Sequence, residues 1–296
     1  MSRSAASRAN RRGEPPPSPE PLPAPAIDSH THLDIVLNGF RTDEPADDAA
    51  VDAEIAAAAA VGVPRLVQVG VDVASSRWSA ELAARHPAVL AAVAVHPNEA
   101  GEGLADDDAL AEIDRLAALP RVRAVGETGL DRFRTGPEGW AAQEASFRAH
   151  VRIAKEHGVA LVIHDRDAHE EVLRVVDDEG APEHVVMHCF SGDAAFARAC
   201  VERGFVLSFA GTLTFGNAGY LREAAARTPV GQLLVETDSP FLTPMPHRGR
   251  PNASRLVPHT VRALAEVTGV ELAELCDALT RNAERVFGPW GTDPTG

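Results

Sequence analysis

Eight short apolar runs, separated by stretches of helical spacing, constrain the fold of this chain more than any other feature. Each run has about the length of a strand and is rich in Val, Ile and Leu on both faces, which is typical of parallel strands buried on both sides. The runs are residues 26–34, 63–70, 88–97, 122–131, 159–167, 183–191, 204–211 and 232–240.

The intervening segments are rich in Ala and Leu at helical spacing. They are residues 47–61, 75–86, 105–118, 138–157, 167–179, 192–203 and 217–227, and two further helical segments, 254–269 and 271–287, follow the eighth run. Strict alternation of strands and helices predicts a parallel sheet, and eight such units close a barrel of about 250 residues. We therefore expect an α/β protein, a (β/α)₈ TIM barrel with an additional C-terminal helix. An open, doubly wound sheet is the alternative.

The first residues of the chain differ from the rest in composition. Residues 1–25 hold seven of the 22 prolines and four arginines, with almost nothing apolar. Such a segment buries too little surface to offset the entropy lost on ordering, which favours a disordered tail. We therefore expect the barrel over residues 26–288, followed by a short C-terminal tail at residues 289–296.

Charge and cysteine content limit the class of protein. The formal net charge of −15 argues against a broad basic face for long nucleic acid, although it leaves room for local grip on a phosphate. The three cysteines, Cys189, Cys200 and Cys276, form no CxxC pair. No apolar run approaches the about 20 residues of a membrane span. We expect a cytoplasmic protein that has no membrane partner and is a monomer.

Polar residues stand at the ends of most of the apolar runs. His30 and His32 close the first run, and their side chains share a face because strand side chains alternate. Later runs end at His96, Glu127, His164, His188 and Asp238. In a (β/α)₈ barrel these positions meet at one mouth. A lone histidine there is usually a satisfied polar group, but six such strand ends need a common partner, and a divalent cation is one.

The spacing admits two divalent ions about 4 Å apart. We place His30, His32 and Asp238 on the first ion, with His164 and His188 on the second. Glu127 bridges the two ions, because Lys155, the single lysine of the chain, lies in a helical segment and cannot supply a carboxylated-lysine bridge. The ligand types leave Zn²⁺, Mn²⁺, Mg²⁺ and Fe²⁺ open.

Seven ordered motifs between residues 26 and 288 resemble those of the TatD family of metal-dependent deoxyribonucleases, which belongs to the amidohydrolase-like barrels. The motifs are DSHTHL at 28–33, VHP at 95–97, GETGLD at 126–131, IHDRDA at 163–168, HCFSG at 188–192, ETDSP at 236–240 and NAERVF at 282–287. The resemblance implies metal ligands at His30, His32, Glu127, His164, His188 and Asp238. It also implies that His96 contacts the phosphate or the leaving group instead of a metal.

Two segments at the mouth depart from the family pattern. Arg132 and Phe133 follow the GLD element, where two aromatic residues are common, and residues 248–254 differ from the usual R-G-K-R-N-E-P loop. Neither departure changes a predicted metal ligand, but both leave the identity of the substrate undetermined.

The expected reaction is hydrolysis of a DNA phosphodiester by metal-activated water. Asp238 would orient the water and accept its proton, Glu127 would assist at the metals, and Glu236 and Thr237 would orient Asp238. The candidate phosphate contacts are Arg166, Arg248 and Arg250. The alternative for Arg166 is a salt bridge, and the alternative for Arg248 and Arg250 is a solvated surface loop. Strand alternation turns Cys189 away from the face of His188, so we expect an inert thiol there.

The expected substrate is short, single-stranded or frayed DNA, cut by a 3′–5′ exonuclease or an endonuclease at abasic sites. A second hypothesis assigns the same centre to a small amide, lactone or phosphoester. A third is a barrel that binds metal or a partner without catalysis.

Overall fold

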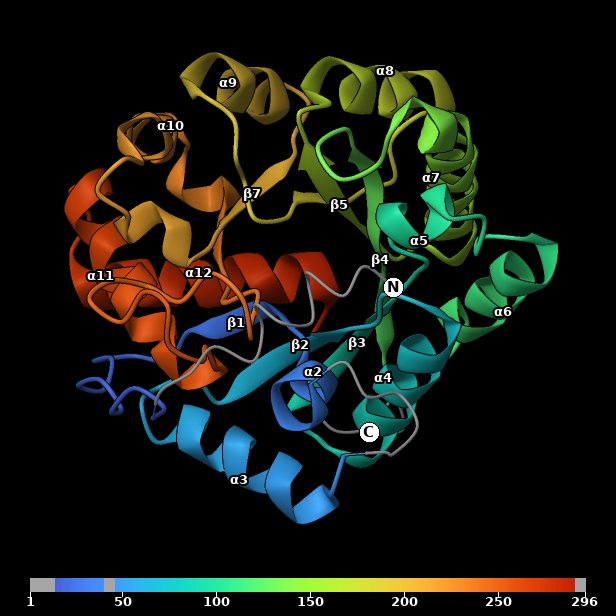
Figure 1. The fold of residues 1–296 in the computed structure, drawn as a ribbon. Helices are drawn as coiled ribbons and strands as arrows, with labels where there is room; N and C mark the ends of the chain where they lie inside the picture. Colours follow the sequence, from blue (N-terminus) through green and yellow to red (C-terminus); the bar gives the residue numbers. More distant parts are fainter. Residues whose placement is uncertain (1–13, 40–45, 291–296) are drawn as a thin grey trace.

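The computed structural model describes residues 14–39 and 46–290. Its eight strands form one parallel sheet in which strand order follows the chain (Figure 1). The strands are β1 (Ile27–Thr31), β2 (Arg65–Val69), β3 (Val89–Val93), β4 (Val122–Asp131), β5 (Ala160–Arg166), β6 (Val185–Met187), β7 (Val206–Phe209) and β8 (Leu233–Val235). The eight predicted strands are confirmed, and the consecutive order excludes a doubly wound sheet, whose order reverses at a switch point.

The sheet curls until its last strand reaches its first, which nearly closes the barrel. Thr31 and Ser239 form a parallel bridge at this seam. On either side of it the backbone N–H of His32 donates to the carbonyl of Ser239 (3.0 Å), and that of Asp238 donates to the carbonyl of His30 (2.9 Å). The seam therefore brings residues 30 and 238 side by side, although they are far apart in the chain.

Helices surround the barrel between successive strands (Figure 1). They are α3 (Asp48–Ala59), α4 (Val73–Arg85), α6 (Asp107–Ala117), α7 (Pro137–His157), α8 (His169–Glu179), α9 (Ala194–Glu202), α10 (Gly219–Arg227), α11 (Val257–Thr268) and α12 (Leu272–Phe287). Each lies within or across a segment of predicted helical spacing. In the described part of the chain, no helix has the length and apolar character needed to cross a membrane.

The 3₁₀ turn η3 (Ser254–Leu256) begins the predicted helical segment 254–269. The spacing did not predict the other short helices, which are α2 (Leu33–Asn38), α5 (Pro97–Gly101) and the 3₁₀ turns η1 (Gly211–Thr214) and η2 (Val230–Gln232). They span three to six residues each, which is too short for a 3.6-residue apolar period to show.

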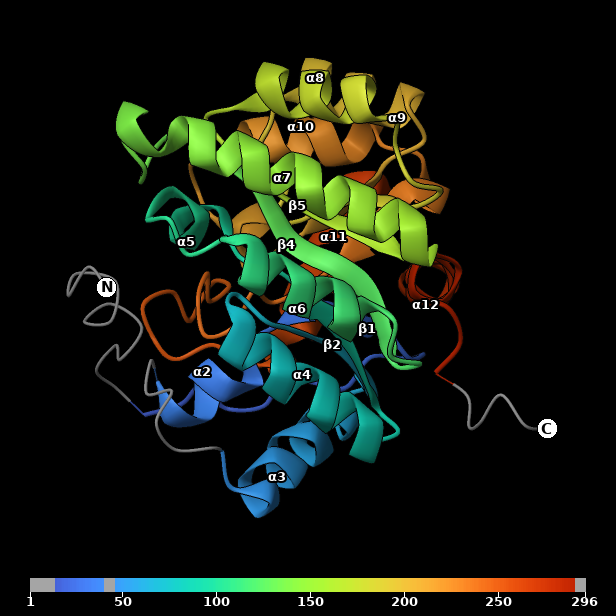
Figure 2. The same ribbon diagram turned by 90° about the vertical axis from the view of Figure 1, so that its right-hand side faces the viewer.

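The end of the barrel opposite the mouth is closed by α12, which lies across from α2 and α5 (Figure 2). Inward-facing strand residues such as Val67 and Leu90 form one apolar cluster with Val286, Phe287 and Trp290. This plug keeps water out of the base of the barrel, so the polar cluster at the mouth rests on a dry, packed interior.

The segment before β1 differs from the expected disordered tail where the structure describes it. Leu22 is buried, and its N–H donates to the carbonyl of Val61 at 3.0 Å. The guanidinium of Arg262 donates to the carbonyls of the two residues that precede Leu22. Defined contacts therefore begin before residue 26, whereas residues 1–13 lie outside the described part of the chain.

The expected C-terminal tail, residues 289–296, also begins with a structured residue. Trp290 is buried, and its indole N–H donates to the carbonyl of Ala88 at 3.1 Å. Residues 291–296 lie outside the described part.

The plug yields a test of stability. Replacing Trp290 with alanine leaves a cavity at the base of the barrel, so we expect the free energy of unfolding to fall by about 3–5 kcal/mol. Urea unfolding monitored by circular dichroism measures this change. Leu104→Ala is the control, because Leu104 is 54% exposed, and its effect should stay within about 0.5 kcal/mol. Equal effects of the two substitutions would contradict the proposed plug.

Candidate metal centre

The carboxylate of Glu127 lies at the centre of the barrel mouth, within β4. It is buried, and imidazole rings surround it. The nearest nitrogen-to-oxygen distances are 2.9 Å to His188, 3.4 Å to His96, 3.4 Å to His164, 3.8 Å to His30 and 4.0 Å to His32. These rings come from the ends of β1, β3, β5 and β6, so the parallel strands deliver them to one point, as the barrel architecture requires.

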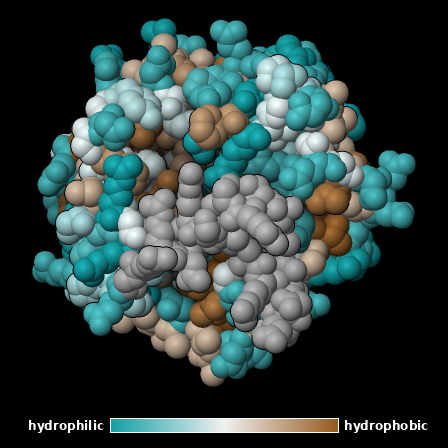
Figure 3. Space-filling view, viewed as in Figure 1, coloured by the Kyte–Doolittle hydropathy of each residue, from teal (hydrophilic) through white to brown (hydrophobic). Residues whose placement is uncertain are grey.

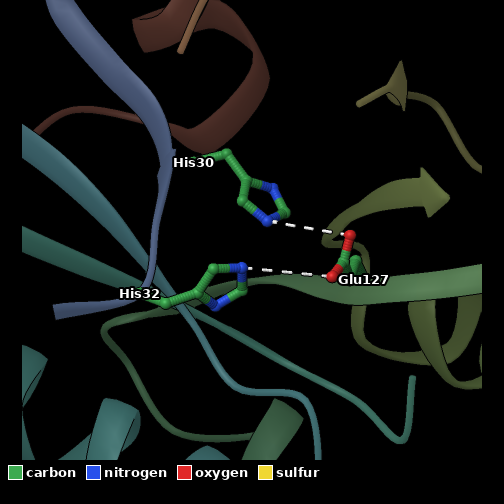
Figure 4. Close-up of side chains that lie close together, drawn as sticks. All are labelled: His30, His32 and Glu127. Carbon is green, nitrogen blue, oxygen red and sulfur yellow. Dashed lines mark ion pairs between the residues drawn. The ribbon is translucent and has the colours of Figure 1, made fainter. Parts of the chain in front are cut away.

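His30, in β1, and His32, directly after the strand, approach Glu127 together (Figure 4). His30 and His32 both direct Nε2 toward the carboxylate. Asp238 joins from the seam, with its Oδ1 3.5 Å from Nε2 of His32. The structure therefore brings together all six residues that the sequence predicts as metal ligands.

Unpartnered polar atoms show that these residues fit a cation. Both ring nitrogens of His30 and Oε2 of Glu127 are buried and form no hydrogen bond within the described part of the chain. Buried polar atoms without partners are costly. Imidazole nitrogens and carboxylate oxygens are the ordinary ligands of divalent transition metals, and a cation would satisfy Oε2 of Glu127 together with one ring nitrogen of His30.

The ligand atoms form overlapping groups. His30, His32 and Glu127 make one group, and His96, Glu127 and His164 make another, with all atoms of each group within 4.8 Å of one another. Glu127 belongs to both groups, which is the position expected of a bridging ligand. The first group matches part of the first predicted ion site, whereas the second places His96 where the sequence analysis placed no ligand.

Burial and charge shift the pKa values of the histidines in opposite directions. Burial, reinforced by the neighbouring His188, lowers the pKa of His30 well below its usual value. Burial also opposes a charge on His32 and His164, but the carboxylates beside them outweigh it and raise the pKa of each ring to about 9. A divalent cation would take the place of these ring protons, because a ligating imidazole must be neutral at the ligating nitrogen.

Contacts on the outer side of the rings hold them in place. Nδ1 of His32 lies 2.9 Å from the carbonyl oxygen of Val69. Nε2 of His164 lies 3.3 Å from Oδ2 of Asp131, whose other oxygen accepts the backbone N–H of Phe133 at 2.9 Å. Partners of this kind fix the orientation of metal-ligating histidines. From the sequence, Asp131 either orients a residue of the metal centre or caps a turn; in the structure its carboxylate contacts His164 and also accepts backbone N–H groups of the following turn.

Glu236 and Thr237 contact different parts of the centre. Oε1 of Glu236 lies 2.8 Å from Nδ1 of His188 and accepts the backbone N–H of Cys189 at 2.9 Å. Thr237 donates its hydroxyl to Oδ2 of Asp28 at 2.6 Å, which ties β8 to β1. That either residue orients Asp238 stays a prediction.

The expected orientation of Cys189 is wrong. Its backbone φ is 44°, so the chain has left the extended conformation, and the alternation of a strand no longer holds. The thiol sulfur lies within 4.8 Å of ligand atoms of His188 and Asp238. Burial, together with the nearby carboxylates, raises the pKa of the thiol well above its usual value, so the sulfur stays protonated.

His96 lies beside the cluster and begins α5. Its Nδ1 accepts the backbone N–H of Asn98 at 3.1 Å and lies 2.9 Å from Oε2 of Glu99. Nε2 is the ring atom left to face Glu127. The assignment of His96 to the phosphate or leaving group, rather than to a metal, stays a prediction.

Of the three candidate phosphate contacts, Arg166 ends β5, and Arg248 and Arg250 lie on the loop that follows β8. Within the described residues Arg166, Arg248 and Arg250 form no ion pair, so the salt-bridge interpretation of Arg166 gains no support. The guanidinium of Arg166 lies 4.2 Å from the ring centre of Phe133, and that of Arg248 lies 4.2 Å from the ring centre of Phe215. Their predicted role on substrate remains untested by these contacts.

A protein-family model described as TatD related DNase matches residues 27–288. The chain belongs to the TatD family. A relative from Mycobacterium tuberculosis, named "Uncharacterized metal-dependent hydrolase TatD", is 46% identical over 266 residues, which cover 88% of this chain and 97% of that protein. The family and this relative's name agree with a metal-dependent hydrolase built on the barrel.

Two further TatD proteins extend the comparison. The protein of Citrobacter rodentium named "3'-5' ssDNA/RNA exonuclease TatD" is 35% identical over 244 residues, covering 80% of this chain and 91% of its own length. The crystal structure of YJJV, a TatD homolog from Escherichia coli K12, superimposes with a TM-score of 0.81 at 25% identity, covering 89% of this chain and 98% of that one. The fold and the family therefore agree with the resemblance seen in the sequence.

The role of Glu127 can be measured by metal binding. Glu127→Gln removes the charge shared by both ligand groups, so we expect the affinity for Zn²⁺ to fall by more than about 100-fold, beyond the usual effect of an outer contact. Competition with a chromophoric chelator measures the affinity. Glu202→Gln is the matched control, because the Glu202 side chain is 69% exposed. Unchanged affinity in Glu127→Gln would contradict the bridging position.

A buried histidine supports the segment that carries His96. Nε2 of His150, in α7, accepts the backbone N–H of Val95 at 3.0 Å, and its Nδ1 lies 2.7 Å from the carbonyl oxygen of Ser146. One neutral tautomer satisfies both contacts. Burial accordingly lowers the pKa of His150 to about 4.

This arrangement predicts a pH dependence of stability. Between pH values of about 6.5 and about 4 the unfolded chain holds a proton on His150 that the folded protein does not, so lowering the pH through this window reduces the free energy of unfolding by up to about 3 kcal/mol. The stability difference between wild type and His150→Gln should therefore shrink as the pH falls. Urea titrations at several pH values measure it, with His184→Gln as a partly exposed control. A constant difference would rule the account out.

Proposed function

We propose that this TatD protein is a deoxyribonuclease that hydrolyses phosphodiester bonds at short, single-stranded or frayed DNA ends. The observation that carries the proposal is the cluster of histidines around Glu127 in a member of this family. The name of the Citrobacter rodentium relative, an exonuclease on single-stranded DNA and RNA, supports this class of substrate. The acidic net charge of −15 suits a substrate gripped at few phosphates.

Six residues would hold two divalent ions, with Zn²⁺, Mn²⁺ or Mg²⁺ as candidates. They are His30, His32, Glu127, His164, His188 and Asp238. When bound, the ions supply Lewis acidity, which lowers the pKa of water and polarises a phosphoryl oxygen. The remaining steps belong to side chains of the protein.

Asp238 is the group best placed to orient water and accept its proton. Its side chain is 14% exposed, whereas those of Glu127 and His30 are 6% and 1% exposed. Solvent therefore reaches this carboxylate first. The hydrogen bond from its backbone N–H to the carbonyl of His30 holds it at the seam. Imidazole rings enclose Glu127, and its negative charge would compensate the positive charges of the centre.

Three side chains would bind the substrate around this point. Arg166 and Arg248 carry guanidinium groups without an acidic partner among the described residues, and Arg250 lies on the same loop as Arg248. Such groups can each form two hydrogen bonds to a phosphate. His96 would contact the phosphate or the leaving oxygen through Nε2.

The finer type of reaction is part of the proposal. We favour removal of nucleotides in the 3′–5′ direction, after the name of the Citrobacter relative, over cleavage at abasic sites. Cys200 and Cys276 are buried free thiols, which suits a reducing compartment such as the cytoplasm. The monomeric state stays a prediction.

The proposal predicts activity that depends on metal and on Asp238. Metal-loaded protein should shorten an end-labelled single-stranded oligonucleotide, and EDTA should abolish this. Asp238→Asn should lower kcat by about 10²–10⁴, the usual contribution of a general base. A product ladder on a denaturing gel measures both the rate and the direction.

Parallel assays distinguish the other hypotheses. A panel of lactones and p-nitrophenyl esters covers the small-substrate alternative, and Arg198→Ala controls for loss of a charge at an exposed position. Faster turnover of a lactone than of DNA would replace the nuclease assignment. Activity that Asp238→Asn leaves unchanged would favour the barrel without catalysis.

A further inference from the structure

An unusual pair of side chains stands at the rim between β4 and β5. Phe133 is 64% exposed, the highest value among the large hydrophobic residues that the structure describes as exposed. It is not packed against the apolar core. The guanidinium of Arg166 lies over its ring, 4.2 Å from the ring centre. Single exposed hydrophobic residues are common on protein surfaces. A function for Phe133 therefore has to be argued from the side chain that contacts it.

Arg166 has no acidic partner that would explain its position. Within residues 14–39 and 46–290 it forms no ion pair, although Asp165 and Asp167 adjoin it in the sequence. It follows the metal-site residue His164 by two positions at the end of β5. The chain therefore presents a free positive charge on an exposed aromatic face, directly beside the candidate centre.

Two other arginine–aromatic pairs at the mouth are built differently. Arg248 covers Phe215, which is partly buried and packs against the core. Arg132 covers Trp140 at 4.6 Å, but its side chain is only 10% exposed and lies 3.7 Å from Glu171. Both pairs have structural partners. The pair of Phe133 and Arg166 is the one of the three in which both side chains are exposed.

Where residues are drawn in colour, the face seen down the mouth is mainly hydrophilic, with hydrophobic residues scattered between (Figure 3). Proteins that bind single-stranded nucleic acid combine exposed aromatic rings with neighbouring positive charges. A base stacks on the aromatic face, and the next phosphate contacts the positive charge. A paired base in a duplex is already stacked and cannot occupy such a ring.

We propose that Phe133 and Arg166 form a base-stacking platform for one unpaired nucleotide next to the scissile phosphate. Phe133 stacks on the base, and Arg166 holds the adjoining phosphate while it keeps the ring in place. This inference rests on the proposed nuclease function and deepens it. The platform makes the enzyme select ends with unpaired bases, with little dependence on which base is present, since every base has a π face.

The test compares two oligonucleotides with identical phosphates. One is a fluorescein-labelled thymidine decamer, and the other is the same decamer with tetrahydrofuran abasic residues in place of all nucleosides. Fluorescence anisotropy of the full-length protein in EDTA measures binding without turnover. Wild type should bind the thymidine decamer about tenfold tighter, as expected for one stacked base.

Variants separate the ring from the charge. Phe133→Ala should lose this tenfold preference and bind the abasic decamer as wild type does. Phe133→Leu should also lose it, because leucine is apolar but cannot stack, whereas Phe133→Tyr should keep it. Arg166→Ala should weaken binding of both decamers. Arg198→Ala is the charge control, because its side chain is 75% exposed on α9, and it should leave both affinities unchanged.

The outcomes distinguish the platform from the nuclease assignment. A preference for bases that survives Phe133→Ala, or wild-type protein that binds both decamers equally, would overturn the platform. Cleavage of the same decamers by metal-loaded wild type is the second arm. If neither decamer is cut while the Phe133-dependent preference persists, the nuclease function fails and the binding site stands. If both are cut at rates that Phe133→Ala leaves unchanged, the nuclease stands and the platform falls.

Discussion

Glu127 is a carboxylate buried at the convergence of parallel strands, and the rest of the mouth is arranged around its charge. Taking an ionised carboxylate out of water costs several kcal/mol unless partners compensate it. Rings from β1, β3, β5 and β6 provide the partners at 2.9–4.0 Å. The rings of His32 and His164 also contact a backbone carbonyl and a carboxylate on their outer sides. A cation at the centre would satisfy buried ligand atoms that form no hydrogen bond.

The barrel supplies the rigidity that such a cluster needs. At the base, α12 and Trp290 seal an apolar interior. At the mouth, the seam between β8 and β1 sets Asp238 beside His30 through backbone hydrogen bonds, and Asp28 reinforces it through Thr237. Ligands far apart in the chain are thus held by strands whose positions are fixed at both ends. Phe133, Arg166, Arg248 and Arg250 are exposed around this centre, and we propose that they set the specificity.

The sequence was sufficient for the fold, and the six residues that it predicts as ligands lie together at the mouth. Val-, Ile- and Leu-rich runs mark buried parallel strands, and a histidine or carboxylate in such a run has to emerge where the strand ends. Other features depended on local backbone geometry that no period reveals. Cys189 turns toward Asp238 because its φ is positive. Leu22 and Trp290 pack into apolar clusters with residues far away in the chain, which segment composition cannot show. The pairing of Phe133 with Arg166 joins the turn after β4 to the end of β5, and it is visible only in three dimensions.

The account depends on cations occupying the space around Glu127. Anomalous diffraction from crystals of the full-length protein, grown with Zn²⁺ or Mn²⁺ and recorded at the absorption edge of the metal, tests this most directly. The account predicts anomalous peaks within bonding distance of the Glu127 carboxylate, flanked by the nitrogens of His30, His32, His164 and His188. Peaks confined to surface carboxylates, with none at the mouth under saturating metal, would contradict it.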